Sequence, residues 1–274
     1  MVGRPRSLIV RRRDIESDPR PQGGSFSSVR WVPFTVPDAV GGALGVFCVD
    51  TTDPVMGLTY DDGPHPDHTP RILDVLAAHD ARATFFVLAR QARSHPDLMR
   101  RIAREGHEVA LHGDDHRSIL TMSTHDAVAM IRACAREVEG LSGAPVTLYR
   151  PPYGAHTPRQ ALAIRRLGLE VVLWSGDGLD WLDDEEDAIA ERALTSTFRG
   201  GILLMHDDRG DPETIAADEV APAFDRGRVT ELILTGLAAR GLTATSVSAL
   251  LANRVPVRSL AKDRAMQTRT GARP

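Results

Sequence analysis

Apolar runs of strand length alternate with amphipathic runs of helix length along most of this 274-residue chain. The runs typical of strands lie at residues 42–50, 55–60, 82–89, 107–112, 146–152, 169–175, 200–206 and 242–247. The runs typical of helices lie at residues 68–80, 95–106, 124–141, 157–168, 185–198 and 229–241, with a last helical turn at 248–254. This order predicts an α/β fold with a parallel sheet and right-handed crossovers. Roughly seven such units favour a seven-stranded (β/α) barrel over an open sheet.

The barrel domain is expected at residues 36–255, which is long enough to bury a large core. Residues 1–35 include a stretch rich in turn and linker residues, and we expect them to be poorly ordered. Residues 256–274 are expected to form a basic tail. Arginines gather at both ends, which is typical of solvated termini. An electrostatic anchor to an anionic surface is the alternative.

Composition narrows the function further. The formal net charge is −4, so neither nucleic acid nor an anionic membrane is expected as a partner. No run approaches about 18 apolar residues, so we expect no transmembrane helix. The N-terminal stretch lacks the apolar core of a signal peptide, which predicts a cytoplasmic protein. No GxGxxG motif follows the first strand, and the single lysine, Lys262, lies in the tail, which argues against dinucleotide, P-loop or Schiff-base chemistry.

Polar side chains follow the ends of five expected strands. They are Asp61 and Asp62, His112 and His116, Arg150, Asp177 and Asp180, and His206. The carboxyl ends of the strands of a parallel barrel share one face, where the loops build the active site. We therefore expect these side chains to meet in one pocket.

The spacing of His112 and His116 is compatible with a metal site. By itself such a pair also occurs as two surface histidines near a strand end. With Asp62, the pair becomes two imidazoles and a carboxylate, a three-ligand set that leaves positions open. The expected cofactor is one divalent ion, and these ligands are compatible with Zn²⁺, Co²⁺, Ni²⁺ or Fe²⁺.

The remaining polar residues fit the proton transfers of a hydrolysis. Asp61 is placed to act as the base that takes a proton from water. His206 can give a proton to a leaving amine, and Asp180 would orient its imidazole and raise its pKa. Arg150 can pair with Asp61. The two prolines of RPPYG stiffen that turn, so that the backbone N–H of Tyr153 could be held toward a developing oxyanion.

Five motifs occur in order along the chain, namely TYDDGP (59–64), HGDDH (112–116), RPPYG (150–154), DGLDW (177–181) and ILLMH (202–206). Together they resemble the five motifs of the polysaccharide deacetylases, carbohydrate esterase family 4. Any one motif is weak, whereas five in this order are specific. The resemblance implies a distorted (β/α) barrel and a divalent metal, usually Zn²⁺, held by Asp-His-His. It also implies release of acetate from N-acetylglucosamine-type sugars.

The resemblance assigns a role to each matching residue. The metal ligands it implies are Asp62, His112 and His116. The residues that carry the chemistry are Asp61 as the base, Arg150 beside it, Tyr153 as the backbone oxyanion donor, and Asp180 as the partner of the catalytic histidine, His206. The substrate-binding residues are Pro152, Trp181 and Leu204, of which the last two form walls of the acetyl pocket.

Two positions depart from the family's pattern. The first motif usually has Phe where this chain has Tyr60, which is a conservative change. The second motif usually has Ser or Thr where this chain has Gly113, so a hydroxyl that would support the ligand loop is missing. Asp114 and Asp115 make the same loop acidic. We expect a solvated carboxylate for Asp114. For Asp115 three alternatives stay open, namely a solvated carboxylate, a partner of a ligand histidine, or a contact to a cationic or hydroxyl-rich substrate.

The expected function is metal-dependent removal of an N-acetyl group from an N-acetylglucosamine-type sugar or a sugar-containing metabolite. Without a visible secretion route, the expected acceptor is small or soluble and intracellular. One alternative is an amidase of the same fold that acts on a non-sugar C–N bond, such as that of a cyclic imide or ureide. Another is a non-catalytic glycan-binding relative, which would need neither a base nor an acid. Asp61 and the RPPYG turn favour the sugar-active pattern.

Overall fold

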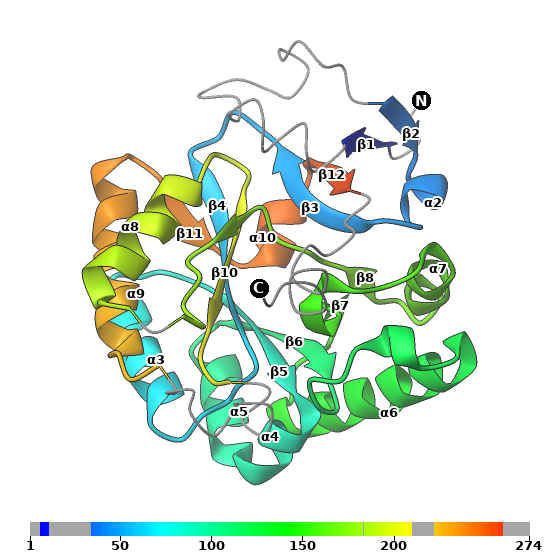
Figure 1. The fold of residues 1–274 in the computed structure, drawn as a ribbon, viewed down its shortest axis with the longest axis horizontal. Coiled ribbons are helices and arrows are strands. Elements are labelled where there is room, and N and C mark those ends of the chain that lie inside the picture. The colour runs from blue at the N-terminus through cyan, green and yellow to red at the C-terminus, as the bar shows by residue number, and fades with distance from the viewer. Residues whose placement is uncertain (1–5, 11–33, 183, 210–221, 260–274) are drawn as a thin grey trace, which may run out of the picture.

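The computed structural model describes residues 6–10, 34–182, 184–209 and 222–259. Its main sheet has seven strands in the order β8-β7-β6-β5-β4-β10-β9, all parallel to their neighbours, and it curls into a half-barrel (Figure 1). These strands are β4 (Val55–Asp61), β5 (Thr84–Leu88), β6 (Glu108–Gly113), β7 (Leu148–Tyr149), β8 (Glu170–Val171), β9 (Gly176–Asp177) and β10 (Ile202–His206). An eighth strand, β11 (Thr243–Thr245), pairs with the first half of β4. The predicted distorted, seven-stranded parallel barrel is confirmed.

Helices surround the outside of the half-barrel. They are α3 (His68–Ala78), α4 (Ala89–Ser94), α5 (Pro96–Arg104), α6 (Thr124–Ser142), α7 (Pro158–Arg165), α8 (Glu186–Ser196) and α9 (Arg226–Ala239). The short helix α10 (Val247–Leu251) differs, because its buried Val247 and Leu250 belong to the same apolar cluster as Phe86 and Ile202 on the inner side of the sheet. Figure 1 shows α3, α8 and α9 on one side of the sheet, α4, α5 and α6 below it, and α7 on the opposite side. Two short 3₁₀ turns, at Ile119–Thr121 and Pro152–Gly154, lie in the loops.

Local signals set the ends of the long helix α6. The Ser123 hydroxyl accepts a hydrogen bond from the backbone N–H of Asp126, which satisfies one of the free donors of the first turn. Gly143 ends the helix in the left-handed conformation with a φ of 70°, which glycine adopts without strain. Helix α7 begins with a reciprocal capping box between Thr157 and Gln160.

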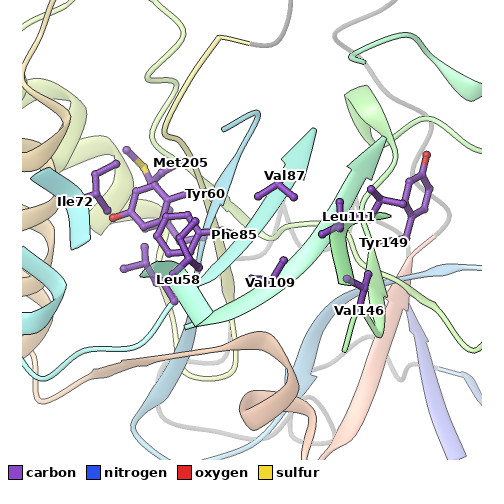
Figure 2. Close-up of a cluster of buried hydrophobic side chains, with 14 of the residues drawn as sticks. Leu58, Tyr60, Ile72, Phe85, Val87, Val109, Leu111, Val146, Tyr149 and Met205 are labelled. Atoms are coloured by element: carbon purple, nitrogen blue, oxygen red, sulfur yellow. The ribbon is translucent and has the colours of Figure 1, made fainter. Parts of the chain in front are cut away.

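Alternation along the strands separates two apolar layers. Alternate residues of β4, β5 and β6 stand on the outer face against the helices, among them Leu58, Tyr60, Phe85, Val87, Val109 and Leu111 (Figure 2). The residues between them belong to a separate inner cluster that includes Phe86, Ala110 and Ile202. Asp61 and His206 have the same parity along their strands as these inner residues, and they lie at the carboxyl ends of β4 and β10. The pleat therefore turns their side chains toward the inside of the half-barrel.

A second, smaller sheet lies beside the barrel, at the top right of Figure 1. Its strands, in the order β2-β1-β12-β3, are β2 (Phe34–Pro37), β1 (Arg6–Val10), β12 (Val255–Ser259) and β3 (Gly45–Asp50). The short helix α2 (Asp38–Gly41) follows β2. The buried guanidinium of Arg258 contacts Glu170 of β8 at 2.8 Å and Asp38 of α2 at 3.0 Å. This ion cluster fastens the second sheet to the edge of the barrel.

The two ends of the chain differ from the expectation in three places. Strand β1 lies within the 1–35 segment that was expected to be poorly ordered, and residues 256–259 of β12 lie within the expected basic tail. The run at 42–50 joins the second sheet as β3 instead of the barrel. These strands form because β12 pairs with both β1 and β3, a long-range pairing that local composition does not reveal. Residues 1–5, 11–33 and 260–274 lie outside the described residues, and the domain boundaries at 36 and 255 stay a prediction.

None of the helices in the described part of the chain combines the length and the apolar character that crossing a bilayer requires.

Candidate active site

The structure gathers the predicted site residues at the carboxyl ends of the barrel strands. Asp61 ends β4 and His206 ends β10, and the two are paired in register across these neighbouring strands. His112 lies at the end of β6, and Arg150 follows β7 directly. The convergence that the parallel order predicts is therefore present. The chemical roles of the individual residues stay predictions.

Asp62, His112 and His116 form the one group in the described residues whose arrangement suits a metal ion. The Asp62 Oδ1 atom lies 3.4 Å from His112 Nε2 and 3.6 Å from His116 Nε2. Ligands about 2.1 Å from a tetrahedral zinc ion are about 3.4 Å from one another. Two imidazole nitrogens and a carboxylate oxygen at this spacing fit a zinc site with an open position.

The hydrogen bonding of His112 supports its role as a ligand. Its Nδ1 atom lies 2.8 Å from the carbonyl oxygen of Arg150, which can only accept, so Nδ1 carries the proton and Nε2 keeps its lone pair. Burial, with the nearby His116 ring, holds the pKa of His112 well below its usual value. The imidazole is therefore neutral, which is the form that binds a metal.

The Asp61 carboxylate is buried and held by Arg150. Arg150 Nη1 donates to Asp61 Oδ1 at 2.6 Å and to Thr59 Oγ1 at 2.8 Å, and Nη2 donates to the carbonyl of Leu173 at 3.1 Å. Burial raises the pKa of Asp61 to about 6, although Arg150 and His206 act to lower it. Asp61 Oδ2 lies 3.8 Å from His112 Nε2, on the side of the ligand group. This carboxylate can act as a base at neutral pH.

His206 and Asp180 form a tight pair. His206 Nδ1 lies 2.6 Å from Asp180 Oδ1, and the backbone N–H of His206 donates to Oδ2 at 2.8 Å. Burial lowers the pKa of His206, but the charge and hydrogen bond of Asp180, together with Asp62 and Asp61, outweigh it and raise the pKa to about 10. The imidazole is therefore protonated at neutral pH and can donate from Nε2.

Tyr153 lies in the 3₁₀ turn after Arg150 and has a φ of 61°. Its ring meets the ring of His116 edge-on, with 4.4 Å between centroids. A tyrosine in the left-handed region costs about 1 to 2 kcal/mol, so the turn must hold it there. The turn thus sits directly against the ligand group, and the predicted use of the Tyr153 N–H as an oxyanion donor stays a prediction.

The three predicted substrate-binding residues differ in exposure. Leu204 is buried on the inner face of β10, and Pro152 is buried in the turn before Tyr153. Trp181 follows Asp180 and has 49% of its surface exposed. Leu204 and Pro152 are therefore placed as fixed surfaces, whereas Trp181 offers an open aromatic face.

The second motif takes a backbone conformation that accounts for its glycine. Gly113 has a φ of 151°, and a Cβ atom there would lie 2.8 Å from the carbonyl oxygen of Asp115. The two acids of this loop pair with arginines: Asp114 lies 2.7 Å from Arg93, and Asp115 lies 2.7 Å from Arg117. The loop is thus shaped around a glycine and tied by surface ion pairs.

Sequence reasoning missed three groups that support the site. Thr59 helps hold Arg150, and its position two residues before Asp61 places it on the same strand face, a signal that the sequence does carry. Arg226, the first residue of α9, donates to Asp180 Oδ2 at 3.3 Å and to the carbonyl of His206 at 2.9 Å. Asp207 contacts the loop after Asp62. No local pattern marks the last two.

Comparison with known proteins gives the family. A family model for polysaccharide deacetylase matches residues 49–172. The chitooligosaccharide deacetylase of Sinorhizobium fredii is 38% identical over 174 residues, which cover 63% of this chain and 76% of that protein. The peptidoglycan-N-acetylglucosamine deacetylase PgdA of Listeria monocytogenes is 36% identical over 156 residues, which cover 57% of this chain and 33% of that protein. The chain belongs to the polysaccharide deacetylase family, as its five motifs predict.

A solved structure agrees with this assignment. The peptidoglycan deacetylase PdaC from Bacillus subtilis superposes with a TM-score of 0.62 at 31% identity, over 74% of this chain and 92% of that chain. The likeness therefore extends over most of both chains.

Proposed function

We propose that this protein is a metal-dependent hydrolase that removes the N-acetyl group from an N-acetylglucosamine-type sugar and releases acetate. One observation carries the proposal: Nε2 of His112, a member of the His-His-Asp ligand group, lies 3.8 Å from the buried Asp61 carboxylate, and Asp61 pairs in register with His206. The proposed ligand group, base and acid thus lie together at the carboxyl ends of the barrel strands. Membership of the polysaccharide deacetylase family supports the same reaction.

The geometry divides the proton transfers between two residues. Arg150 occupies Asp61 Oδ1, so Oδ2 is the atom that takes the proton from the attacking water. Asp180 occupies His206 Nδ1, so Nε2 carries the proton that the leaving nitrogen takes as the C–N bond breaks. The water oxygen joins the acyl carbon, and the products are acetate and the free amine. A buried partner engages one atom of each side chain, so only Oδ2 of Asp61 and Nε2 of His206 are left for proton transfer.

The residues that would hold the ion are Asp62, His112 and His116. A divalent ion bound there supplies a Lewis acid that polarises the acyl carbonyl. Zn²⁺ is the ion we propose, because the ligand spacing suits a tetrahedral site. The same donors also accept Co²⁺, Ni²⁺ or Fe²⁺.

The substrate class follows from the relatives. Their names include chitooligosaccharide deacetylase and peptidoglycan-N-acetylglucosamine deacetylase, so N-acetylglucosamine units in an oligomer or a glycan strand are the acceptors we propose. Trp181 follows Asp180 directly and has an exposed side chain, which is suited to stack on a sugar ring. The intracellular location expected from the sequence stays a prediction.

The test is acetate release by the zinc-loaded protein. The panel holds N-acetylglucosamine, short chitooligosaccharides, peptidoglycan fragments and a cyclic imide. We expect acetate from at least one of the sugars, and its loss on chelation and in Asp61→Asn. Ring opening of the imide without acetate would instead assign the protein to the amidases. Zinc binding without turnover of any compound would favour a glycan-binding protein.

A further inference from the structure

Asp207, the residue after His206, is buried against the loop that follows the two aspartates of the first motif. Its side chain is 1% exposed. Asp207 Oδ1 accepts a hydrogen bond from the backbone N–H of Gly63 at 3.0 Å, and Oδ2 accepts one from the Thr69 hydroxyl at 2.6 Å. Thr69 Oγ1 in turn accepts from the backbone N–H of His65 at 2.8 Å. One carboxylate therefore holds the loop at both of its ends.

The loop packs closely around this carboxylate. A Cβ atom on Gly63 would overlap the carboxylate of Asp207, so only glycine fits at that position. Both oxygens of Asp207 are engaged by loop donors, which leaves the ligand group to Asp62 and the two histidines. Asp207 is therefore a support for the site and not a fourth ligand.

The backbone of Asp62 needs such a support. Its φ is 82°, in the left-handed region that a residue with a side chain rarely adopts. Conformations of this kind persist where the neighbouring structure fixes them. On one side the N–H of Asp62 donates to the carbonyl of Phe86 at 3.2 Å. On the other side the next N–H, that of Gly63, is held by Asp207.

We propose that Asp207 is a positioning residue for the metal site: it holds the Asp62 backbone in its left-handed conformation through Gly63 and Thr69, and so points the Asp62 carboxylate at His112 and His116. The inference rests on the proposed metal dependence of the same site. On this proposal the affinity of the site for zinc, as well as the rate of hydrolysis, depends on Asp207, although Asp207 does not contact the ion.

The test measures zinc binding by the full-length protein stripped of metal. The dissociation constant for Zn²⁺ is obtained by competition with a chelating dye, and the apo unfolding midpoint is recorded for each variant. The variants are Asp207→Ala, Asp207→Asn and Thr69→Val. The matched control is Thr84→Val, at the opposite end of the sheet. Like Thr69, Thr84 donates one hydrogen bond to a carboxylate and accepts one from a backbone N–H. It donates to Glu108 at 2.6 Å and accepts from the N–H of Val247 at 2.8 Å.

We expect Asp207→Ala to weaken zinc binding by about 10- to 100-fold, the usual effect of removing a residue that orients a ligand. Asp207→Asn keeps an oxygen for Gly63 and should recover part of the affinity. Thr69→Val should weaken binding several-fold. Thr84→Val should lower the apo midpoint as much as Thr69→Val does, yet leave the zinc constant unchanged.

Three results would overturn the inference. The first is wild-type zinc affinity in a folded Asp207→Ala protein. The second, which decides the matter if Asp207→Ala fails to fold, is equal loss of zinc affinity in Thr69→Val and Thr84→Val, since that pattern reflects general destabilisation. The third is a wild-type protein that binds no zinc, which would overturn the proposed metal dependence as well. Because none of these readouts needs turnover, a failure to find the substrate does not affect them.

Discussion

Asp61 and His206 are paired residues on neighbouring parallel strands, and each is held by a buried partner of opposite charge. Arg150 binds Asp61, and Asp180 binds His206. Burial raises the pKa of Asp61 to about 6, while Asp180, against the effect of burial, raises that of His206 to about 10. Between these two values Asp61 is ionised and His206 is protonated. Environments that separate two pKa values in this way are typical of an acid–base pair.

Replacement of the base should abolish most of the activity and spare the metal. Asp61→Asn keeps an oxygen for Arg150 but cannot take a proton, so we expect kcat to fall by about 10²- to 10⁴-fold. Zinc affinity should stay close to that of the wild type, because the three ligands are unchanged. Acetate release and dye competition measure the two quantities. Asp97→Asn, an exposed carboxylate that pairs with Arg100, serves as the control. Near-normal turnover in Asp61→Asn would remove this residue from the role of base.

Loss of Asp180 should shift the alkaline side of the pH profile. His206 acts in its protonated form, so activity is present below its pKa and is lost as pH rises through about 10. Asp180 is the main group that raises this pKa, with Asp62 and Asp61 as smaller contributors. In Asp180→Asn burial then dominates, and the alkaline limb of kcat against pH should move to lower pH. An unchanged limb would show that His206 is not the acid.

Replacement of Arg226 should move the alkaline limb of the pH profile in the opposite direction, to higher pH. Its guanidinium is buried, contacts Asp180 and shares that negative charge with His206. Arg226→Met removes the competing cation, so the pKa of His206 should rise, by up to about 1 unit, which corresponds to about 1.4 kcal/mol. We expect kcat to fall with little change in KM, because the Asp180 carboxylate loses a support. Arg228→Met, an exposed arginine on the same helix, is the control. A limb that moves down in Arg226→Met would contradict the charge argument.

The sequence predicts that the candidate site residues lie close together, and there is a physical reason for this. In a parallel barrel every strand delivers its carboxyl end to the same face, so residues at strand ends meet whichever strands are neighbours. Asp61, His112, Arg150 and His206 could thus be placed together without knowledge of the strand order. Period-two alternation would also have placed Thr59 beside Asp61.

The parts that could not be predicted depend on contacts between distant segments. An apolar strand such as β3 can join any free sheet edge, and its place beside β12 is fixed by pairing with the other end of the chain. Arg226 begins a helix, and its buried guanidinium contacts Asp180, the carbonyl of His206 and the Phe224 ring. Asp207 follows the fifth motif as an ordinary acid, and its partner Thr69 lies 138 positions away.

Introducing the family's usual serine at position 113 should lower both the stability and the zinc affinity of this protein. Gly113 has a φ of 151°, where a residue with a side chain costs about 1 to 3 kcal/mol, and a Cβ would lie 2.8 Å from the Asp115 carbonyl. We expect Gly113→Ser to lower the unfolding free energy by about that amount. Because residue 113 adjoins His112, zinc affinity should fall as well. Chemical denaturation and dye competition measure both effects.

A second glycine separates backbone strain from the simple addition of a hydroxyl. Gly140 lies inside α6, where a Cβ atom would meet no other atom within 4 Å, so Gly140→Ser should be neutral or stabilise the helix by a few tenths of a kcal/mol. If Gly113→Ser instead binds zinc more tightly than the wild type, the loop can rebuild around a serine. The backbone would then not require glycine at this position. Gly113 would instead mark the loss of a hydroxyl that supports the ligand loop, as the departure from the family's pattern suggests.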